Sequence, residues 1–298
     1  MRGLTPGFAE QVDLVAATYR SMAAGRVELP PKPGVHPRQD AFIHAMPAYL
    51  ADSDVAAIKW VSGYPSNKAL GLPYITGLMI VNDAATGLPL AIMDAAEITA
   101  ARTAAASGAC IRQLAPDGWR RAAIIGCGEQ GRYHAELIAA LHPDADLHVY
   151  DPDPDRMASM PVAVTPHRSI REAVEDAEVI VTLAPIVQPP APSLERAWLG
   201  DRFLALPADF NATFRADVTA DADAVLADDV GQWRYYQGQG QFGGWPAPAS
   251  SVGEVLDDPP VAGRIVACCL GVGALDAAFA HAVLQAARAA GVGLALPT

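Results

Sequence analysis

Residues 122–135, which read AAIIGCGEQGRYHA, decide the fold predicted for this chain. A short apolar run leads into three glycines spaced G-x-G-x-x-G, and a helical segment follows. In such a turn the first glycine permits a tight bend, the second lets a pyrophosphate approach the backbone, and the third lets the helix pack closely on the strand. The phosphate lies at the helix N-terminus. We therefore predict a dinucleotide-binding turn made of Gly126, Gly128, Glu129, Gln130 and Gly131.

The segment LHVYDPDP places Asp151 at the end of the next expected strand, 20 residues after Gly131. A carboxylate at this point accepts hydrogen bonds from a ribose diol and repels a 2′-phosphate. The pattern therefore favours NAD(H) over NADP(H), with Asp153 as an alternative ribose partner. Strand ends line the cofactor crevice of such sheets, and VTLAP adds three candidate contacts, Thr182, Leu183 and Ala184.

From Arg121 onward, apolar strands alternate with helical segments, which predicts an α/β domain with a parallel, doubly wound sheet. The expected strands are 121–126, 146–151, 178–184, 202–209 and 224–229. The preceding residues predict a helix at 8–24, strands at 41–50 and 55–65, a hairpin around 83–87 and a helix at 97–114. Residues 231–246, rich in aromatic side chains, Gln and Gly, are expected to form a loop, and residues 274–297 contain an expected amphipathic helix.

Composition narrows the function classes. The chain has 298 residues, enough for two domains, with 51% hydrophobic residues and a formal charge of −12. So acidic a chain is a poor partner for nucleic acid or for an anionic membrane. Four cysteines without a CxxC pair indicate reduced thiols and a cytoplasmic protein, and we expect no signal peptide, membrane span or metal site.

Three basic residues stand out because Lys and Arg rarely occupy apolar surroundings unless they are paired or functional. Lys59 lies inside an apolar strand, Arg102 in a helix of small residues, and Arg38 just before another apolar strand. His44 and His134 are more typical of structural histidines.

Five segments together resemble the ornithine cyclodeaminase/mu-crystallin family. They are MPAYL (46–50), KWVSGYPSNKALGLP (59–73), DAATGLPLAIMD (83–94), ITAARTAAASGA (98–109) and IIGCGEQGRYHA (124–135). The resemblance implies a homodimeric enzyme that uses a nicotinamide cofactor on small α-amino or α-imino acids. It also implies an α+β substrate and dimerisation domain at 1–118, completed by 259–298, with a Rossmann domain inserted at 119–258. The substrate of this family sits in the crevice between nicotinamide and first domain.

The same resemblance assigns roles to individual residues. Arg102 matches the arginine that binds the substrate α-carboxylate, and Arg38 matches a second one. Lys59 matches the active-site lysine, which would exchange protons near neutral pH, and Asp209 matches an aspartate proposed to shuttle protons at the amino group. Met46, in MPAYL, belongs to the expected substrate site.

The leading hypothesis is an NAD(H)-dependent oxidoreductase that transfers hydride to or from Cα of an α-amino or α-imino acid. A cyclodeaminase with catalytic NAD⁺ and a ligand-binding protein like mu-crystallin are the alternatives. Ornithine cyclodeaminases carry a glutamate before the Met-Pro step, and AFIHAMPAYL has no carboxylate there. Residues 231–246 could close over the crevice or pack at an interface.

Overall fold

A computed structural model of the chain describes residues 1–186, 189–260 and 263–295. The chain divides into two compact units. Unit 1 comprises Met1–Arg102 and Val272–Thr298, and unit 2 comprises Thr103–Gly271.

Unit 1 is built on an antiparallel sheet in the order β1-β3-β4-β5-β6, with β2 paired to β3. Its strands are β1 (Val27–Glu28), β2 (Gly34–Val35), β3 (Phe42–Leu50), β4 (Val55–Gly63), β5 (Ile75–Asp83) and β6 (Pro89–Asp94). The chain also forms short 3₁₀ helices, η1 (Arg2–Leu4) and η2 (Pro65–Leu70). The expected strands and hairpin are therefore present.

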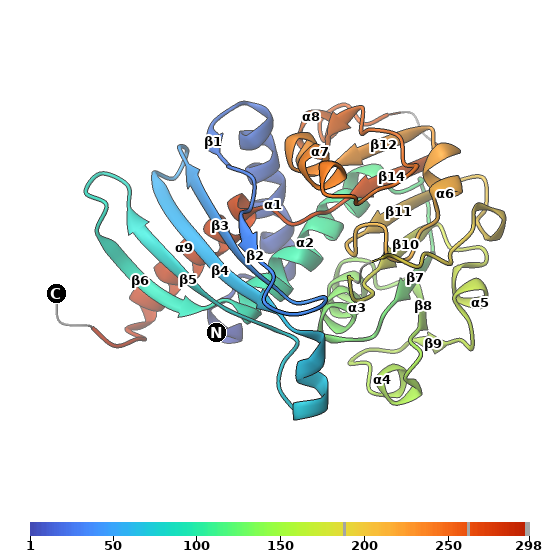
Figure 1. The fold of residues 1–298 in the computed structure, drawn as a ribbon, viewed down its shortest axis with the longest axis horizontal. Helices are drawn as coiled ribbons and strands as arrows, with labels where there is room; N and C mark the ends of the chain where they lie inside the picture. The colour runs from blue at the N-terminus through green and yellow to red at the C-terminus, as the bar shows by residue number, and fades with distance from the viewer. Residues whose placement is uncertain (187–188, 261–262, 296–298) are drawn as a thin grey trace. The chain divides into compact units, whose positions relative to one another are not determined.

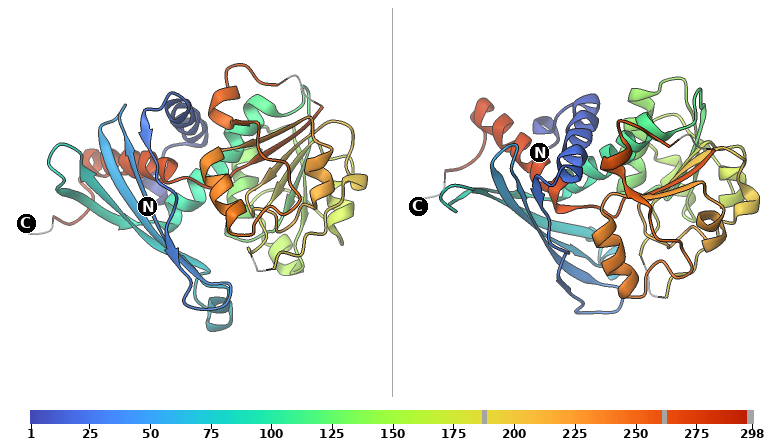
Figure 2. Two further views of the ribbon diagram at one scale, coloured as in Figure 1. Left: turned by 45° about the horizontal axis from the view of Figure 1, so that its top comes forward. Right: turned by 90° about the horizontal axis from the view of Figure 1, so that it is seen from above.

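One face of this sheet is covered. Helix α9 (Gly273–Ala290) packs on β3, β4 and β5, and α1 (Phe8–Ala23) packs on α9. Figure 2 shows both helices on the same side of the sheet. Strand β4 alternates between buried and more exposed residues, as expected for a sheet with one covered face. Lys59 occupies a buried position in this alternation.

Unit 2 contains a parallel sheet in the order β13-β12-β14-β11-β10-β7-β8-β9. Its strands are β7 (Arg121–Ile125), β8 (Asp146–Tyr150), β9 (Thr165–Pro166), β10 (Val179–Thr182), β11 (Phe203–Pro207), β12 (Ala224–Ala227), β13 (Ser250–Ser251) and β14 (Arg264–Cys268). Strand order reverses between β7 and β10, and ligands of doubly wound sheets bind beyond the strand ends at such a point.

Helices lie on both faces of this second sheet (Figures 1 and 2). They are α3 (Glu129–Leu141), α4 (Pro154–Ala158), α5 (Ile170–Val174), α6 (Ala216–Ala220), α7 (Val230–Gly238) and α8 (Val252–Val255), with a short η3 (Arg196–Trp198). Helix α2 (Ala96–Leu114) begins in unit 1 and continues into unit 2. The predicted α/β class with a Rossmann-type sheet is confirmed.

The expectation of a loop over 231–246 is wrong for its first half, where α7 forms. Asp229 caps this helix by accepting a hydrogen bond from the Gln232 amide, and Trp233 is fully buried. Trp233 stacks on Phe242 with ring centroids 5.0 Å apart, and Trp245 packs beside Phe242. Trp233, Phe242 and Trp245 therefore belong to the core of unit 2, whereas Tyr235 is exposed.

The division of the chain also differs from the predicted boundaries at 118 and 259. It falls inside α2, after Arg102, and between Gly271 and Val272. Strand β14, which the sequence analysis placed in the returning C-terminal segment, pairs with β11 and β12 in the second sheet. A five-residue buried strand carries no alternation to distinguish it from a buried helix segment.

Candidate active site

Lys59 lies in the interior of unit 1 with 1% of its surface exposed. Its Nζ donates to Asp276 Oδ1 at 2.7 Å and to Thr99 Oγ1 at 3.3 Å. Lysine is almost never buried without a partner, because removing its charge from water costs several kcal/mol. The ion pair with Asp276 partly offsets that cost.

Asp276 also binds Arg102, whose Nε donates to the same oxygen, Oδ1, at 3.1 Å. Both side chains are buried, Asp276 completely. The cluster therefore joins three elements of unit 1: Lys59 from β4, Arg102 from α2 and Asp276 from the first turn of α9. We refer to Lys59, Arg102 and Asp276 as the charged triad.

A glycine sets the position of Asp276. Helix α9 starts with Gly273, and a Cβ built at this residue would meet the Met46 carbonyl oxygen at 2.9 Å. Met46 in turn lies opposite Lys59 in the β3–β4 pairing. The close approach of α9 to β3 thus brings the first turn of the helix next to Lys59.

The electrostatics of the triad favour proton exchange. The pKa of Lys59 is lowered to about 7: burial is the largest cause, the charges of Arg102 and Lys32 also lower the pKa, and Asp276 opposes them. Groups with a pKa near the operating pH are effective general acids and bases. A buried lysine with this pKa is therefore a candidate catalytic group.

The other two predicted substrate residues, Met46 and Arg38, differ in whether they lie near the triad. Met46 is buried on β3 beside Lys59. Arg38 is exposed and donates to the neighbouring Pro37 carbonyl, so the structure does not bring it to the triad. The basic residue that is buried in this region is Lys32, which lowers the pKa of both Lys59 and His44.

Sequence reasoning missed Asp276 and Lys32. Asp276 is the only charged residue in the helical run GALDAAFAHAV, and the same criterion that singled out Arg102 would have found it. Lys32 follows two prolines in an extended segment, where nothing in the sequence indicates burial.

In unit 2 the glycine turn has the predicted form. Gly126 has φ +107°, and a Cβ there would meet the Leu183 carbonyl oxygen at 2.8 Å. At Gly131 a Cβ would lie 2.0 Å from the Gly126 carbonyl oxygen, so only glycine lets α3 pack here. Gly128 is the N-cap of α3 and makes no side-chain cap, and Glu129 and Gln130 open the helix.

Asp151 lies just after β8, next to this turn. Its Oδ2 accepts the Cys127 amide at 2.8 Å and its Oδ1 accepts the Asp153 amide at 2.9 Å. A carboxylate has about four acceptor sites, so the two that remain suit a ribose diol. Asp153 caps α4 and pairs with Arg156, whose Nη1 is also 3.9 Å from Asp151.

Asp209 follows β11 and is 1% exposed. Its carboxylate accepts hydrogen bonds from Thr182 Oγ1 at 2.6 Å, Thr213 Oγ1 at 2.7 Å and the Ala184 amide at 2.9 Å. Burial raises the pKa of Asp209, and these three donors oppose the rise. The structure therefore brings three predicted residues, Asp209, Thr182 and Ala184, into contact at the carboxyl edge of the sheet, beside Leu183, whose amide donates to Ile125.

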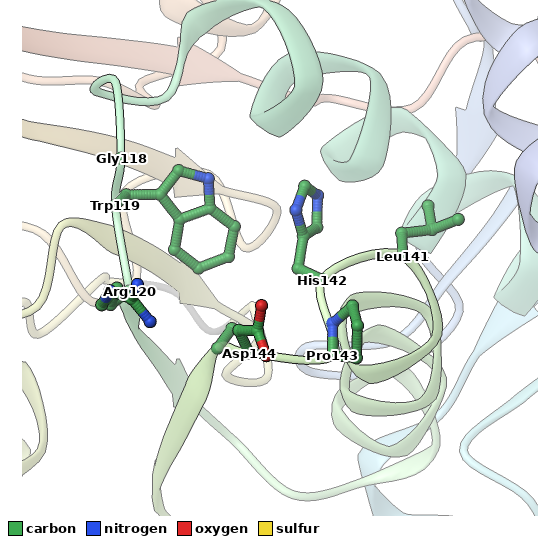
Figure 3. Close-up of a pocket in the computed structure, with 8 residues that line it drawn as sticks. Gly118, Trp119, Arg120, Leu141, His142, Pro143 and Asp144 are labelled. Carbon is green, nitrogen blue, oxygen red and sulfur yellow. The ribbon is translucent and has the colours of Figure 1, made fainter.

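A hollow of about 300 Å³ lies elsewhere in unit 2, where Trp119 and His142 face each other with ring centroids 4.9 Å apart (Figure 3). Its residues Arg120 and Asp144 come just before β7 and β8. It therefore lies at the amino edge of the parallel sheet, opposite the glycine turn, and does not belong to the predicted cofactor site.

His134 has the environment of a structural residue, and the described residues offer neither a metal-binding group nor a membrane-spanning helix. His134 is fully buried, bonds to Ser107 and to the Gln130 carbonyl, and burial lowers its pKa to about 4, as expected for a structural histidine. Within residues 1–186, 189–260 and 263–295, no three His, Cys, Asp or Glu side chains are grouped to hold a metal. No helix in these ranges is long and apolar enough to cross a membrane.

Known proteins resemble this chain over most of its length. A family model described as "Ornithine cyclodeaminase/mu-crystallin family" matches residues 5–259. Nodulation efficiency protein NfeD of Rhizobium meliloti is 39% identical over 235 residues, which are 77% of this chain and 72% of that protein. Alanine dehydrogenase of Archaeoglobus fulgidus is 31% identical over 235 residues, covering 76% and 71%.

The fold is shared with a solved structure of Thermococcus litoralis Δ1-pyrroline-2-carboxylate reductase in complex with NADH and L-proline. The TM-score is 0.84 at 23% identity, with 98% of this chain and 97% of that chain covered.

Proposed function

This chain belongs to the ornithine cyclodeaminase/mu-crystallin family, and we propose that it is an NAD(H)-dependent oxidoreductase acting on a small α-amino or α-imino acid. The observation that carries this proposal is the charged triad, in which a lysine with a pKa of about 7 lies beside a buried arginine. An arginine is suited to bind a carboxylate, and such a lysine is suited to exchange a proton.

The residues of unit 2 fit a dinucleotide. At Gly126 and Gly131 a Cβ would clash with backbone atoms. Gly128, the N-cap of α3, leaves the N-terminus of this helix open for a pyrophosphate. Asp151 offers acceptor sites for a ribose diol and its negative charge disfavours a 2′-phosphate, which supports NAD(H). The bound nicotinamide would supply, or accept, the hydride exchanged with Cα of the substrate.

The residues of unit 1 would bind the substrate acid and manage the proton. Arg102 uses its Nε for Asp276, which leaves the two Nη groups to bind a carboxylate in a bidentate fashion. Lys59 Nζ would donate a proton to the substrate nitrogen during imine reduction, when Cα gains the hydride, and would take it back during amine oxidation. Arg38 and Asp209 keep the roles that the family resemblance implies as predictions.

A specific observation favours reduction or oxidation over cyclodeamination. His44 shares the inward face of β3 with Met46, near the position of the glutamate found in ornithine cyclodeaminases. Burial, together with the charges of Lys32, His36 and Lys59, lowers the pKa of His44 to about 4. A neutral imidazole does not provide a counter-ion for the distal ammonium group of ornithine.

An absorbance assay at 340 nm tests the proposal, with NAD⁺ or NADH against amino acids, cyclic imines, and 2-oxo acids with ammonium. We expect stoichiometric change in NADH with at least one substrate class and loss of turnover in Lys59→Met, which should still bind NADH. Ammonia release with a cyclised product and no net NADH change would establish a cyclodeaminase. Ligand-induced thermal stabilisation without any turnover would indicate a binding protein.

We also propose that the protein is a homodimer, formed through the uncovered face of the first sheet. Its exposed apolar side chains include Trp60, Leu78, Leu90 and Ile92 on three adjacent strands, β4 to β6. Trp60 lies directly opposite Leu78, and Ile80 opposite Ile92. A second copy of the same face suits this regular apolar surface, since symmetric dimers bury the same patch on both subunits.

We place the enzyme in the cytoplasm. The four cysteines are free and buried, and the Sγ atoms of Cys110 and Cys269 are 4.0 Å apart without a bond. Reduced thiols this close are typical of a reducing compartment.

A further inference from the structure

We propose that Asp276 is a positioning residue of the active site, which holds the Lys59 ammonium and the Arg102 guanidinium in the arrangement needed for catalysis. This inference rests on the proposed function of Lys59 and Arg102. Asp276 lies on the returning C-terminal helix, 217 positions after Lys59 in the sequence.

The geometry of one oxygen atom carries the inference. Oδ1 of Asp276 accepts both Lys59 Nζ at 2.7 Å and Arg102 Nε at 3.1 Å, so a single atom fixes two cations from different elements. Oδ2 is buried and has no hydrogen-bond partner among the described residues. A carboxylate that served only to anchor α9 would be expected to use both oxygens, because a buried unsatisfied acceptor is costly.

The charge balance explains what the carboxylate does. Two cations on their own would repel each other in a buried site, and Asp276 neutralises one of them. The triad then keeps one net positive charge, which matches one substrate carboxylate. Other basic groups near Lys59 are Lys32 and His44, and both Lys32 and Arg102 disfavour the charged form of the Lys59 amine. Asp276 is the acidic group that opposes burial, Arg102 and Lys32.

Removing the negative charge should therefore discharge Lys59. In Asp276→Asn the burial of Lys59 and the charge of Arg102 remain, while the favourable ion pair is lost. We expect the Lys59 titration midpoint to move from about 7 in the wild type to lower pH by about one unit or more. Above the midpoint, one unit corresponds to about tenfold fewer charged lysines.

The composition of the chain makes this shift directly measurable. The protein contains only three lysines, Lys32, Lys59 and Lys68. Lysine selectively labelled with ¹³C at Cε gives three side-chain NMR signals, which Lys32→Arg and Lys68→Arg assign. The signals are titrated in the full chain with NADH bound, in the wild type, in Asp276→Asn and in the matched control Asp54→Asn. Asp54 is exposed, bonds to Tyr49 and lies outside the triad.

The expected result is a shift of the Lys59 signal in Asp276→Asn only, with Lys68 unchanged in all three proteins. An unshifted Lys59 midpoint in a folded Asp276→Asn protein would overturn the proposal. Asp276→Glu keeps the negative charge but moves the carboxylate oxygen. This variant also tests the proposal if Asp276→Asn does not fold. We expect Asp276→Glu to keep the Lys59 midpoint within about half a unit while kcat falls at least tenfold. Wild-type kcat in Asp276→Glu would contradict the positioning role.

The titration separates this inference from the proposed function. A shifted Lys59 midpoint without turnover of any substrate by the wild type would leave Asp276 coupled to Lys59 but refute the oxidoreductase. Wild-type turnover with a pH profile of kcat/KM that Asp276→Asn does not move would support the oxidoreductase and refute the role of Asp276. NADH affinity, measured by fluorescence, should be equal in all variants because the residues proposed to bind NADH lie in unit 2.

Discussion

The buried charge of Lys59 couples the stability of the protein to pH. Burial lowers its pKa from 10.5 to about 7 in the folded protein. Between these values the unfolded chain holds a proton on this amine that the folded protein has released. Stability therefore rises with pH across this window, by at most about 1.4 kcal/mol per unit from this residue. Below pH 7 both states are protonated, and the full cost of the buried charge is present.

Lys59→Met should remove this dependence. Methionine fills a similar volume without a charge, so the difference in unfolding free energy, wild type minus Lys59→Met, should increase as pH rises from 7 to 10. Urea denaturation at several pH values measures it. Taking the difference cancels the contributions of cysteines, tyrosines and other groups that titrate in this range, because both proteins contain them. A difference that stays flat from pH 7 to 10 would mean that Lys59 keeps an ordinary pKa in the folded state.

At the scale of single residues, the sequence pointed to two of the three members of the triad. Lys59 and Arg102 were found because a basic side chain in apolar surroundings needs a reason to be there. Asp276 was missed, although the same argument applies to it, because the family resemblance assigned no role to any residue of its helix. Arg38 was expected in the site and lies exposed, whereas Lys32 is buried near Lys59. Lys32 and Arg38 lie six positions apart in a proline-rich segment. Which of the two is buried depends on the direction in which the chain turns, and the sequence does not indicate that direction.

At the scale of elements, the glycine turn contains one glycine that the fold requires, Gly131, and one that only a bound pyrophosphate would require, Gly128. A Cβ at Gly131 would overlap the Gly126 carbonyl oxygen, so Gly131→Ala must displace α3 or the turn. At Gly128 a Cβ would meet only the flexible end of Arg156, at 3.9 Å, and φ is −73°. Alanine therefore fits at Gly128 in the free protein, but its methyl group would obstruct a pyrophosphate at the helix N-terminus.

Two alanine substitutions test this distinction. Gly131→Ala should destabilise the protein by about 2–3 kcal/mol, because backbone must move. Gly128→Ala should cost less than about 1 kcal/mol and should weaken NADH binding at least tenfold. Thermal unfolding and NADH fluorescence titration give the two readouts for each variant. Wild-type NADH affinity in Gly128→Ala would show that the phosphate does not lie at this residue.

Elements with a clear pattern were predicted and elements defined by packing were not. Helix α2, expected at 97–114, spans Ala96–Leu114, since its alanine-rich sequence needs little tertiary support. Helix α7 was expected to be a loop because its segment is rich in Gln, Gly and aromatic residues. It forms because Asp229 caps it and because Trp233 enters a cluster with Phe242. The contact between Trp233 and Phe242 joins residues nine positions apart and cannot be seen in a local pattern.

At the scale of the whole molecule, the chain leaves unit 1 and returns to it. Val272–Thr298 belongs with the first 102 residues, and Asp276 reaches Lys59 because of that return. The family resemblance predicted the return of the C-terminal helix, but not that the second sheet would take β14 from the same segment. In the proposed dimer, the same sheet of a second copy covers the outer face of the first sheet.

Carboxylates on that outer face test the proposed dimer. In Leu78→Glu with Ile92→Glu, a symmetric interface would bury four charges without partners, which costs more than the apolar contacts contribute. We expect the wild type to run at about twice its chain mass of 31.2 kDa in size-exclusion chromatography with light scattering, and the double variant at the chain mass. Leu294→Glu, on an exposed residue near the C-terminus, is the matched control and should remain dimeric. A wild type of 31.2 kDa would refute the dimer. A double variant that is folded by circular dichroism and still dimeric would move the interface to another face, because four unpaired carboxylates are not tolerated at the centre of an apolar contact.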